Sequence, residues 1–272
     1  MMRALYTAAT GMIAEQTNVD TIANNLANVN TTGYKTERTE FKSLLYQTLQ
    51  TRTTTANGED KPVGAQVGLG TRVAATTSMY TQGSMYASES STDFALEGDG
   101  FFAVRDIDGQ TYYTRNGNFT WAQDGNGNTI LTNTDGDPVL DADGNLIQVP
   151  AGVSAESMMF DLTGEISYMG EDGNPVALNQ SFGIYRFNNP AGLEKLSGSR
   201  LEATEASGEP VLESTNPALT PTKVCQYYLE GSNVQVADEM VNMIIAQRAY
   251  ELNSKAITTA DSMLETANNL RR

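Results

Sequence analysis

Residues 2–30, MRALYTAATGMIAEQTNVDTIANNLANVN, and residues 236–264, VADEMVNMIIAQRAYELNSKAITTADSML, carry the same apolar repeat near the two ends of a 272-residue chain. The residues that recur at intervals of seven are Leu5, Met12, Val19 and Leu26 in the first segment, and Val236, Met243, Tyr250, Ile257 and Leu264 in the second. A seven-residue apolar repeat predicts a helix that packs against other helices. We therefore expect one helical domain built from both ends of the chain, with the middle inserted into it.

The limits of these two helices are marked by short polar motifs. The first helix is expected to stop near residue 29, because asparagines compete for backbone hydrogen bonds and Gly33 permits a positive φ. The second is expected to open after Ser232, since Ser232 and Gln235 fit a capping box. Asp238 and Glu239 would then lie at the positive end of the helix dipole.

The middle of the chain has the signals of β-structure. Turn dipeptides recur at Asp108-Gly109, Asn116-Gly117, Asp124-Gly125, Asp135-Gly136, Asp143-Gly144 and Asp172-Gly173. Such pairs favour tight hairpins, because both central residues tolerate positive φ. Residues 34–50 fit a helix or an extended segment equally well. Residues 51–70 predict an irregular or β-like arm, and residues 216–231, which contain Pro217 and Pro221, predict an extended one.

The predicted fold class is therefore α+β, with a discontinuous N/C-terminal helical coiled-coil domain and an inserted, mostly antiparallel β domain. Residues 1–33 and 232–272 are assigned to the terminal α-helical coiled-coil domain. Residues 34–70 and 216–231 are assigned to an extended connecting arm, and residues 71–215 to an outer β-rich domain. Most helical stripes simply form a core, so an antiparallel pair within one monomer would also satisfy the repeats. Broad stripes and little other helix in the chain favour contacts between copies.

Composition excludes several classes of function. The chain has 33 acidic and 17 basic residues, for a net charge of −16, which argues against nucleic acid and against anionic membranes as partners. Residues 1–30 and 234–272 each carry a net charge of −1, so the remaining −14 lies in the middle. No apolar run has the length of a membrane span, and we expect no membrane insertion.

The chain offers no obvious chemistry. It has no histidine and a single cysteine, Cys225, so the commonest general base and metal ligand are missing and no intrachain disulfide can form. The runs that start at Asp124 and Asp141 resemble the beginning of a calcium loop, but they lack Gly at position six and Glu at position twelve. We predict no catalytic residue, no metal site and no cofactor, and therefore no enzyme.

A family resemblance appears at residues 24–35, which read NNLANVNTTGYK. This segment resembles the ANNLAN…TxGxK signature of the bacterial flagellar axial proteins, the rod and hook family. The matching positions are Asn24, Asn25, Leu26, Ala27, Asn28, Gly33, Tyr34 and Lys35. Residues 97–102, 113–117, 239–244 and 247–251 resemble further conserved segments of that family, and within it the chain is most similar to the distal-rod members.

The resemblance implies a structural subunit of the flagellar basal-body rod, exported and located outside the cytoplasmic membrane. Such a subunit self-assembles as a homo-oligomer into a rigid, hollow helical tube that transmits torque from motor to hook and forms the export channel. The implied partners are the proximal rod proteins, the hook protein, the rod-cap protein and the flagellar type III export apparatus, with ring proteins where an outer membrane is present.

The resemblance also implies an assembly interface along the terminal helices. Its predicted residues are Leu5, Met12, Val19, Ile22, Leu26, Val236, Met243, Ile244, Tyr250, Ile257 and Leu264. Two alternatives remain. One is a hook or proximal rod subunit of the same family. The other is a secreted, acidic, β-rich enzyme or adhesin that its end helices merely oligomerise.

Overall fold

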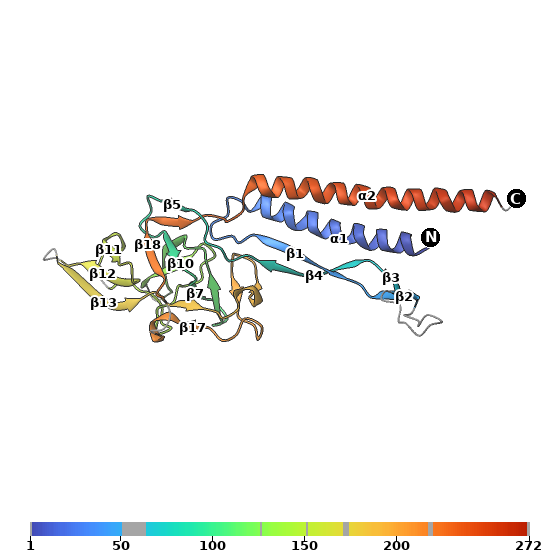
Figure 1. The fold of residues 1–272 in the computed structure, drawn as a ribbon. Helices are drawn as coiled ribbons and strands as arrows, with labels where there is room; N and C mark the ends of the chain where they lie inside the picture. Colours follow the sequence, from blue (N-terminus) through green and yellow to red (C-terminus); the bar gives the residue numbers. More distant parts are fainter. Residues whose placement is uncertain are drawn as a thin grey trace. The chain divides into compact units, whose positions relative to one another are not determined.

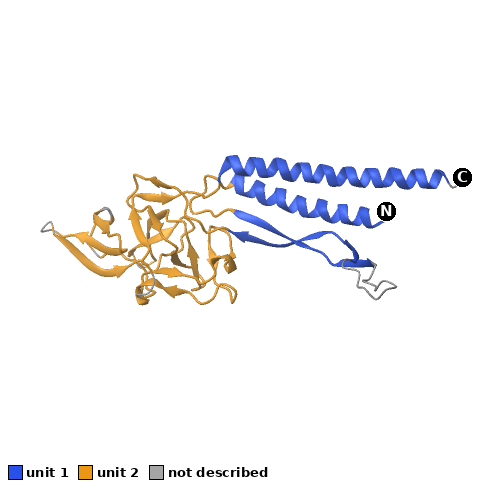
Figure 2. Cartoon of the chain, viewed as in Figure 1, with its two compact units in different colours: residues 1–27, 37–78, 235–272 blue, residues 28–36, 79–234 orange. Residues whose placement is uncertain are grey.

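The computed structural model describes residues 2–50, 64–125, 127–150, 152–170, 174–216 and 220–270. The chain forms two compact units (Figures 1 and 2). Unit 1 comprises residues 1–27, 37–78 and 235–272, and unit 2 comprises residues 28–36 and 79–234. Both units are therefore discontinuous in sequence. Within the described part of the chain, no helix is long and apolar enough to cross a membrane.

Unit 1 contains the only two α-helices among the described residues, α1 (Met2–Ala27) and α2 (Val236–Asn269). They lie side by side and run antiparallel, since Asn25 contacts Glu239 near one end and Gly11 faces Asn253 further along (Figure 1). Four alanines are among the buried apolar residues of the pair: Ala8, Ala14, Ala246 and Ala260. Small side chains let the two helix axes approach closely, and they leave larger apolar residues on other faces.

Unit 1 also contains an extended hairpin. Strand β1 (Glu37–Ser43) pairs antiparallel with β4 (Thr71–Ser78), and β2 (Tyr46–Gln50) pairs with β3 (Ala65–Gly68). The stretch 34–50, which the sequence left open, is thus extended rather than helical. Strand β4 belongs to this hairpin, although the sequence boundaries assign it to the β-rich region. Most of the arm predicted at 51–70, residues 51–63, lies outside the described residues.

Unit 2 is built from short antiparallel strands. Its largest sheet has six strands in the order β15-β16-β8-β7-β14-β17, and a three-stranded sheet has the order β11-β12-β13. The remaining pairs are β10-β9, β18-β6 and β19-β5. The bounds are β5 (Met85–Ala87), β6 (Phe94–Glu97), β7 (Phe101–Arg105), β8 (Thr111–Thr114), β9 (Phe119–Gln123), β10 (Thr129–Asn133), η1 (Ala155–Ser157), β11 (Met158–Phe160), β12 (Glu165–Met169), β13 (Pro175–Ser181), β14 (Ile184–Arg186), η2 (Pro190–Gly192), β15 (Glu194–Lys195), β16 (Leu201–Glu202), β17 (Val211–Leu212), η3 (Glu213–Thr215), β18 (Lys223–Gln226) and β19 (Tyr228–Glu230).

The main core of unit 2 is rich in aromatic rings. Phe94, Phe102, Phe119 and Phe182 pack together, with ring centroids 4.9 to 6.4 Å apart, and are joined by aliphatic side chains from strands β6, β10 and β12. A smaller cluster lies around Phe101. Aromatic side chains bury large apolar areas, so this unit has a complete core of its own.

The turn predictions have mixed outcomes. Gly109, Gly136 and Gly144 have the positive φ expected of them, and the Asp108-Gly109 turn joins β7 to β8. The Asp124-Gly125 hairpin joins β9 to β10, with the positive φ at Gly127. The hairpin predicted at Asn116-Gly117 is wrong, because the flanking strands do not pair: β8 pairs with β7 and β16, and β9 pairs with β10. Gly117 instead permits a close approach, since a Cβ there would overlap the Phe94 carbonyl oxygen. Asp172-Gly173 lies outside the described residues.

The capping box predicted at the start of the second helix is also wrong. Helix α2 begins at Val236 with Gln235 as its N-cap, and no side chain caps it. Ser232 Oγ instead accepts a hydrogen bond from the Val234 amide, 3.2 Å away, before the helix begins. The first helix ends at Ala27, two residues earlier than expected.

Candidate functional site: helix faces and a buried charge network

The predicted interface residues divide between covered and uncovered helix faces. On α1, Ile22 is buried and Leu5, Met12, Val19 and Leu26 are half-buried. On α2, Met243, Ile257 and Leu264 are half-buried, whereas Val236, Ile244 and Tyr250 are exposed. The seven-residue line of α2 therefore lies at the margin of its contact with α1. The centre of that contact includes Glu239, Ala246 and Ala260.

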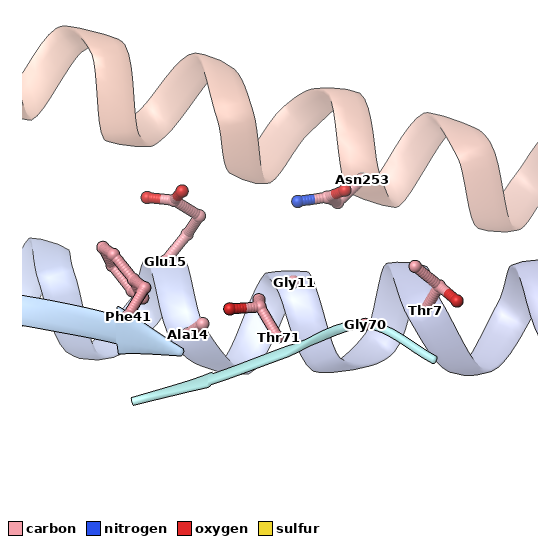
Figure 3. Close-up of a pocket in the computed structure, with 8 residues that line it drawn as sticks. All are labelled: Thr7, Gly11, Ala14, Glu15, Phe41, Gly70, Thr71 and Asn253. Atoms are coloured by element: carbon pink, nitrogen blue, oxygen red, sulfur yellow. The ribbon is translucent and has the colours of Figure 1, made fainter. Parts of the chain in front are cut away.

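A recess of about 330 Å³ lies where α1, α2 and the hairpin of unit 1 meet (Figure 3). It is lined by Thr7, Gly11, Ala14, Glu15, Phe41, Gly70, Thr71 and Asn253. Asn253 reaches from α2 toward α1, and a Cβ at Gly11 would lie 2.8 Å from its Nδ2 (Figure 3). On the hairpin side, a Cβ at Gly70 would lie still closer to the Thr10 hydroxyl oxygen. The absence of a side chain at Gly11 and Gly70 thus allows both α2 and the hairpin to lie close to α1.

Large apolar side chains remain exposed on both helices. On α1 they are Met2, Tyr6 and Ile13, with exposed fractions of 58% or more. On α2 they include Met240, Val241, Ile244, Ile245, Leu252 and Met263, with exposed fractions of 55% or more. Single exposed apolar residues need no explanation, but an exposed group of this size on one unit indicates a surface that another molecule covers.

Asn25 ties three elements of unit 1 together. Its Nδ2 donates to the Glu37 carbonyl oxygen at 2.8 Å and to Glu239 Oε2 at 3.1 Å. Its Oδ1 accepts from the Glu37 amide at 2.9 Å. The side chain is 1% exposed, so one buried amide joins the end of α1 to the start of β1 and to the first turn of α2.

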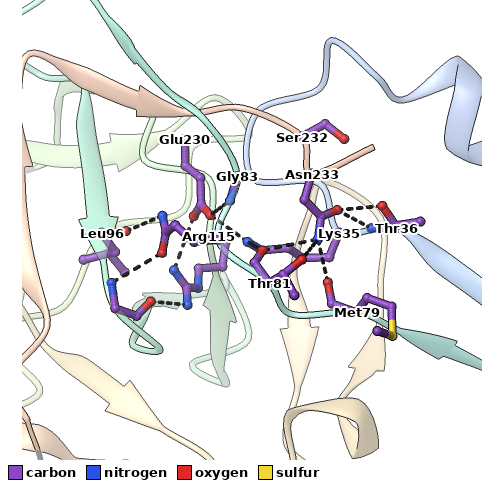
Figure 4. A network of polar contacts seen from close by, with 12 residues as sticks. Lys35, Thr36, Met79, Thr81, Gly83, Leu96, Arg115, Glu230, Ser232 and Asn233 are labelled. Atoms are coloured by element: carbon purple, nitrogen blue, oxygen red, sulfur yellow. Dashed lines mark hydrogen bonds and ion pairs between the residues drawn. The ribbon is translucent and has the colours of Figure 1, made fainter. Parts of the chain in front are cut away.

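Lys35 lies in a buried charge network in unit 2 (Figure 4). Its Nζ is 2.6 Å from Glu230 Oε1 and donates to the Thr81 carbonyl oxygen at 2.8 Å. Arg115 Nη1 is 3.3 Å from Glu230 Oε2, and the Gly83 amide donates to Glu230 Oε1 at 2.9 Å. One carboxylate therefore faces two buried cations. Burial lowers the pKa of the Lys35 ammonium, and the neighbouring Glu230 carboxylate acts in the opposite direction.

Asn233 is a second centre of the same network. Its Oδ1 accepts from the amide and from the hydroxyl of Thr36, both at 2.7 Å. Its Nδ2 donates to the Met79 carbonyl oxygen at 2.8 Å and to Thr81 Oγ1 at 2.7 Å (Figure 4). Residues 28–36, 79–83 and 230–233 are thereby joined by side chains that satisfy backbone groups outside regular strands.

Gly33 is required by this arrangement for two reasons. Its φ is +69°, a conformation that other residues adopt at an energetic cost. A Cβ would also lie 2.7 Å from the carbonyl carbon of Arg115. Its amide donates to the Glu230 carbonyl oxygen at 2.8 Å, so close approach at Gly33 brings the motif against the strand that carries Glu230.

The structure thus gives two of the motif residues, Asn25 and Lys35, buried structural positions in different units. Asn24 and Ala27 are exposed, and Leu26, Asn28, Gly33 and Tyr34 are half-buried. Glu230 and Asn233 could not be predicted as site residues, because neither belongs to an apolar repeat or a motif. Arg115 lies in residues 113–117, a segment that resembles the family, but nothing in that segment indicates that it is buried beside Glu230. Among the described residues, no cluster of three or more acidic or cysteine side chains could hold a metal ion.

Charge is divided sharply between the units. Unit 2 has 22 acidic and 7 basic residues, a net charge of −15, whereas unit 1 has 11 acidic and 10 basic residues, a net charge of −1. A near-neutral unit with exposed apolar helices can crowd against copies of itself, and a strongly acidic unit stays solvated.

Three family models match the chain in order. Residues 5–35 match the model described as flagella basal body rod protein, and residues 95–168 match the flagellar hook protein FlgE/F/G D1 domain. Residues 226–270 match the flagellar basal body rod FlgEFG protein C-terminal model. The first match contains Asn25 and Lys35, and the last contains Glu230 and α2.

The flagellar basal-body rod protein FlgG of Borreliella burgdorferi is 44% identical over 274 residues, which span all of both chains. The chain belongs to the flagellar basal-body rod protein family. The FlgG proteins of Agrobacterium fabrum and of Buchnera aphidicola subsp. Acyrthosiphon pisum are 42% and 39% identical. These matches cover 96% and 99% of the chain, and 97% and 100% of the two relatives. This member of the rod protein family is a structural subunit of the bacterial flagellar basal body, not an enzyme.

Proposed function

We propose that this rod subunit polymerises through unit 1 into a rigid, hollow helical tube. The proposal rests on the difference between the two units. Unit 1 is near-neutral and exposes large apolar side chains on both helices, whereas unit 2 is acidic and has its own core. The terminal helices form a coiled-coil inner layer of the tube, and the predicted interface residues from Leu5 to Leu264 lie in that layer. The tube transmits torque from motor to hook and encloses the export channel.

The domain roles follow from this proposal. Unit 1 supplies the inner tube domain through α1 and α2 and the connecting arm through its β-hairpin, and unit 2 supplies the outer β-rich domain. The proposed partners are further copies of the chain, the proximal rod, hook and rod-cap proteins, the flagellar type III export apparatus, and ring proteins in cells with an outer membrane. The relatives' names support rod assembly, and the chain's apolar helix surfaces supply a physical reason for it.

Polymer formation by the purified chain tests the proposal. We expect sedimentable tubes above a critical concentration, seen by electron microscopy. Leu26→Asp and Ile257→Asp should abolish them, because each puts a carboxylate into a half-buried apolar contact. Trp121, the only tryptophan, packs against the core of unit 2, so its fluorescence reports whether that unit remains folded. Thr258→Asp, at an exposed position of α2, is the matched control.

Limited proteolysis adds a second measurement. Helices that bury their apolar faces on assembly should be cut readily in dilute monomer and protected in the polymer. Normal tubes from Leu26→Asp and Ile257→Asp would overturn the proposed packing. Ends that resist protease equally in dilute monomer would mean that the helices already bury their faces within one chain.

A further inference from the structure

The side chain of Asn233 makes every hydrogen bond that an asparagine amide can make, all within unit 2 (Figure 4). Its Oδ1 accepts from the amide and the hydroxyl of Thr36, both at 2.7 Å. Its Nδ2 donates to the Met79 carbonyl oxygen at 2.8 Å and to Thr81 Oγ1 at 2.7 Å. An asparagine amide has two acceptor sites and two N–H donors, so these partners fix its orientation. Asn233, Thr36, Met79 and Thr81 are called the Asn233 clamp below.

The residues that Asn233 joins are the ends of chain segments. Residue 36 is the last residue of unit 2 before strand β1, and residue 79 is the first residue after strand β4. Asn233 itself lies two residues before unit 1 resumes at Gln235, the N-cap of α2. The chain passes between the units at four places in sequence. One side chain therefore fixes the unit 2 end of three of these passages.

These segment ends lie outside regular strands. Residues 34–36, 79–84 and 231–235 belong to no helix or strand, so no ladder of backbone hydrogen bonds orders them. The Met79 amide donates to the Thr36 carbonyl oxygen at 2.9 Å, and the Asn233 amide to the Tyr34 carbonyl oxygen at 3.4 Å. The Asn233 side chain adds the bonds to the Thr36 amide and the Met79 carbonyl group. Its removal takes these partners from both backbone groups.

We propose that Asn233 is a positioning residue for assembly. In the single subunit it fixes the segment ends from which α2 and the hairpin of unit 1 continue, and it thereby lowers the concentration at which the polymer forms. Ordering the backbone of one residue is unfavourable by a factor of about ten in an equilibrium constant. Residues that unit 2 already holds in place do not have to be ordered when unit 1 packs into the polymer.

This inference rests on the proposed function, which it extends to a residue outside unit 1. Asn233 belongs to unit 2 and is none of the predicted interface residues. It therefore acts on assembly through the position of Thr36, Met79 and the start of α2, and its effect can be separated from the loss of an apolar contact.

Asn233→Ala in the full chain is the first test. The critical concentration, measured by sedimentation, should rise about tenfold, because at least one segment end must then be ordered during assembly. The variant keeps the ion pair between Lys35 and Glu230 and the aromatic core of unit 2. Trp121 fluorescence should therefore show that unit 2 is still folded.

Asn189→Ala is the matched control. Asn189 is also an asparagine of unit 2 that binds backbone, since its Nδ2 donates to the Ala206 carbonyl oxygen at 3.0 Å. Neither residue lies at a passage between the units in sequence. The critical concentration of this variant should stay within about twofold of the parent value. An equal rise in Asn189→Ala and Asn233→Ala, or no rise in Asn233→Ala, would overturn the proposal.

Thr36→Val tests the same contact from its other side. It removes the hydroxyl that binds Asn233 Oδ1 and keeps the backbone amide. We expect a rise in the critical concentration of about threefold, as for one lost hydrogen bond. The double variant Thr36→Val with Asn233→Ala should match Asn233→Ala alone, because both changes act through one contact. Independent effects that multiply in the double variant would contradict the proposal.

A covalent replacement separates positioning from a merely structural role. Cys225→Ser removes the only native thiol. In that background, Thr36→Cys with Asn233→Cys abolishes the hydrogen bonds of the Asn233 amide and supplies two neighbouring thiols, which dibromobimane can join. The unlinked chain should have a raised critical concentration, and the linked chain should return to the value of Cys225→Ser alone. A linked chain that still assembles poorly would show that fixing these two ends is not what assembly requires.

Hydrogen exchange measures the Asn233 clamp in the dilute subunit. The Thr36 amide should exchange slowly in the parent chain and faster in Asn233→Ala, because it loses its acceptor. The Gly33 amide, which donates to the Glu230 carbonyl oxygen at 2.8 Å, should be unaffected. Loss of protection at both amides, or at neither, would overturn the proposal. If the unmodified chain forms no polymer, the proposed function itself fails, and exchange at Thr36 still decides whether Asn233 fixes this segment end.

Discussion

Lys35 Nζ lies 2.6 Å from Glu230 Oε1, although 195 residues separate the two in sequence. The side chains are 3% and 1% exposed, and Arg115, equally buried, shares the same carboxylate. Burying an ion is unfavourable unless it has a counter-charge and hydrogen-bond partners. Glu230 is therefore the residue on which two buried cations depend, and the motif lysine is held in place by a carboxylate near the opposite end of the chain.

Glu230→Gln should destabilise unit 2 by about 3–5 kcal/mol, because it leaves Lys35 and Arg115 buried without a counter-charge. Urea unfolding followed by Trp121 fluorescence measures this change. The matched control is Glu97→Gln, which breaks the exposed pair between Glu97 and Lys223 and should cost less than about 1 kcal/mol. A double variant, Lys35→Met with Glu230→Gln, should recover part of the loss. Equal effects of Glu230→Gln and Glu97→Gln would refute the assigned role.

Gly33→Ala should be more harmful than Gly109→Ala. Both glycines have positive φ, +69° and +82°, so each substitution should cost about 1–2 kcal/mol for backbone conformation. A Cβ at Gly109 meets nothing within 4 Å, whereas one at Gly33 meets the backbone of Arg115. We expect an additional loss of about 1–3 kcal/mol at Gly33 from this overlap. Chemical denaturation of the two variants gives the comparison, and equal losses would mean that the motif tolerates a side chain there.

Asn25→Ala should destabilise unit 1 by about 3 kcal/mol, since it removes two hydrogen bonds to the backbone of Glu37 and one to the carboxylate of the buried Glu239. Asn25→Asp should be at least as harmful, because a second carboxylate would then face Glu239. Helical circular dichroism during urea unfolding is the measurement. Asn242→Ala, at an exposed position of α2, should change stability by less than about 0.5 kcal/mol. Similar losses in the two alanine variants would contradict the buried role of Asn25.

Tyr113→Phe should change how the stability of unit 2 depends on alkaline pH. Burial raises the pKa of Tyr113 from 10.0 to about 12. In the unfolded chain this phenol ionises near pH 10, so its contribution is present below pH 10 and is lost as the pH rises toward 12. At about 1.4 kcal/mol per pKa unit, the wild type should lose about 2–3 kcal/mol more than Tyr113→Phe over that interval. Denaturation curves of both proteins at pH 9 and pH 12 test this, and parallel pH profiles would show that Tyr113 does not titrate differently on folding.

Local patterns predicted much of the fold. A seven-residue repeat survives in a helix whatever the helix packs on, so Leu5 to Leu26 and Met243 to Leu264 were enough to place two terminal helices. Turn dipeptides likewise placed the hairpin at Asp108-Gly109, because the conformational freedom of glycine is local. The family motif at residues 24–35 was recognisable for the same reason: it depends on adjacent residues only.

The helical ends, the β-rich middle, the unequal distribution of charge and the family could therefore be predicted from the amino-acid sequence. The hydrogen bond of Asn25 to Glu239, the sharing of Glu230 by Lys35 and Arg115, and the choice of uncovered helix faces could not, because they depend on how distant segments pack. A charged residue is predicted to be exposed unless its partner is known, and the partner here lies almost two hundred residues away. Apolar repeats tell which residues can be buried, but the neighbours that bury them are chosen by packing of distant segments.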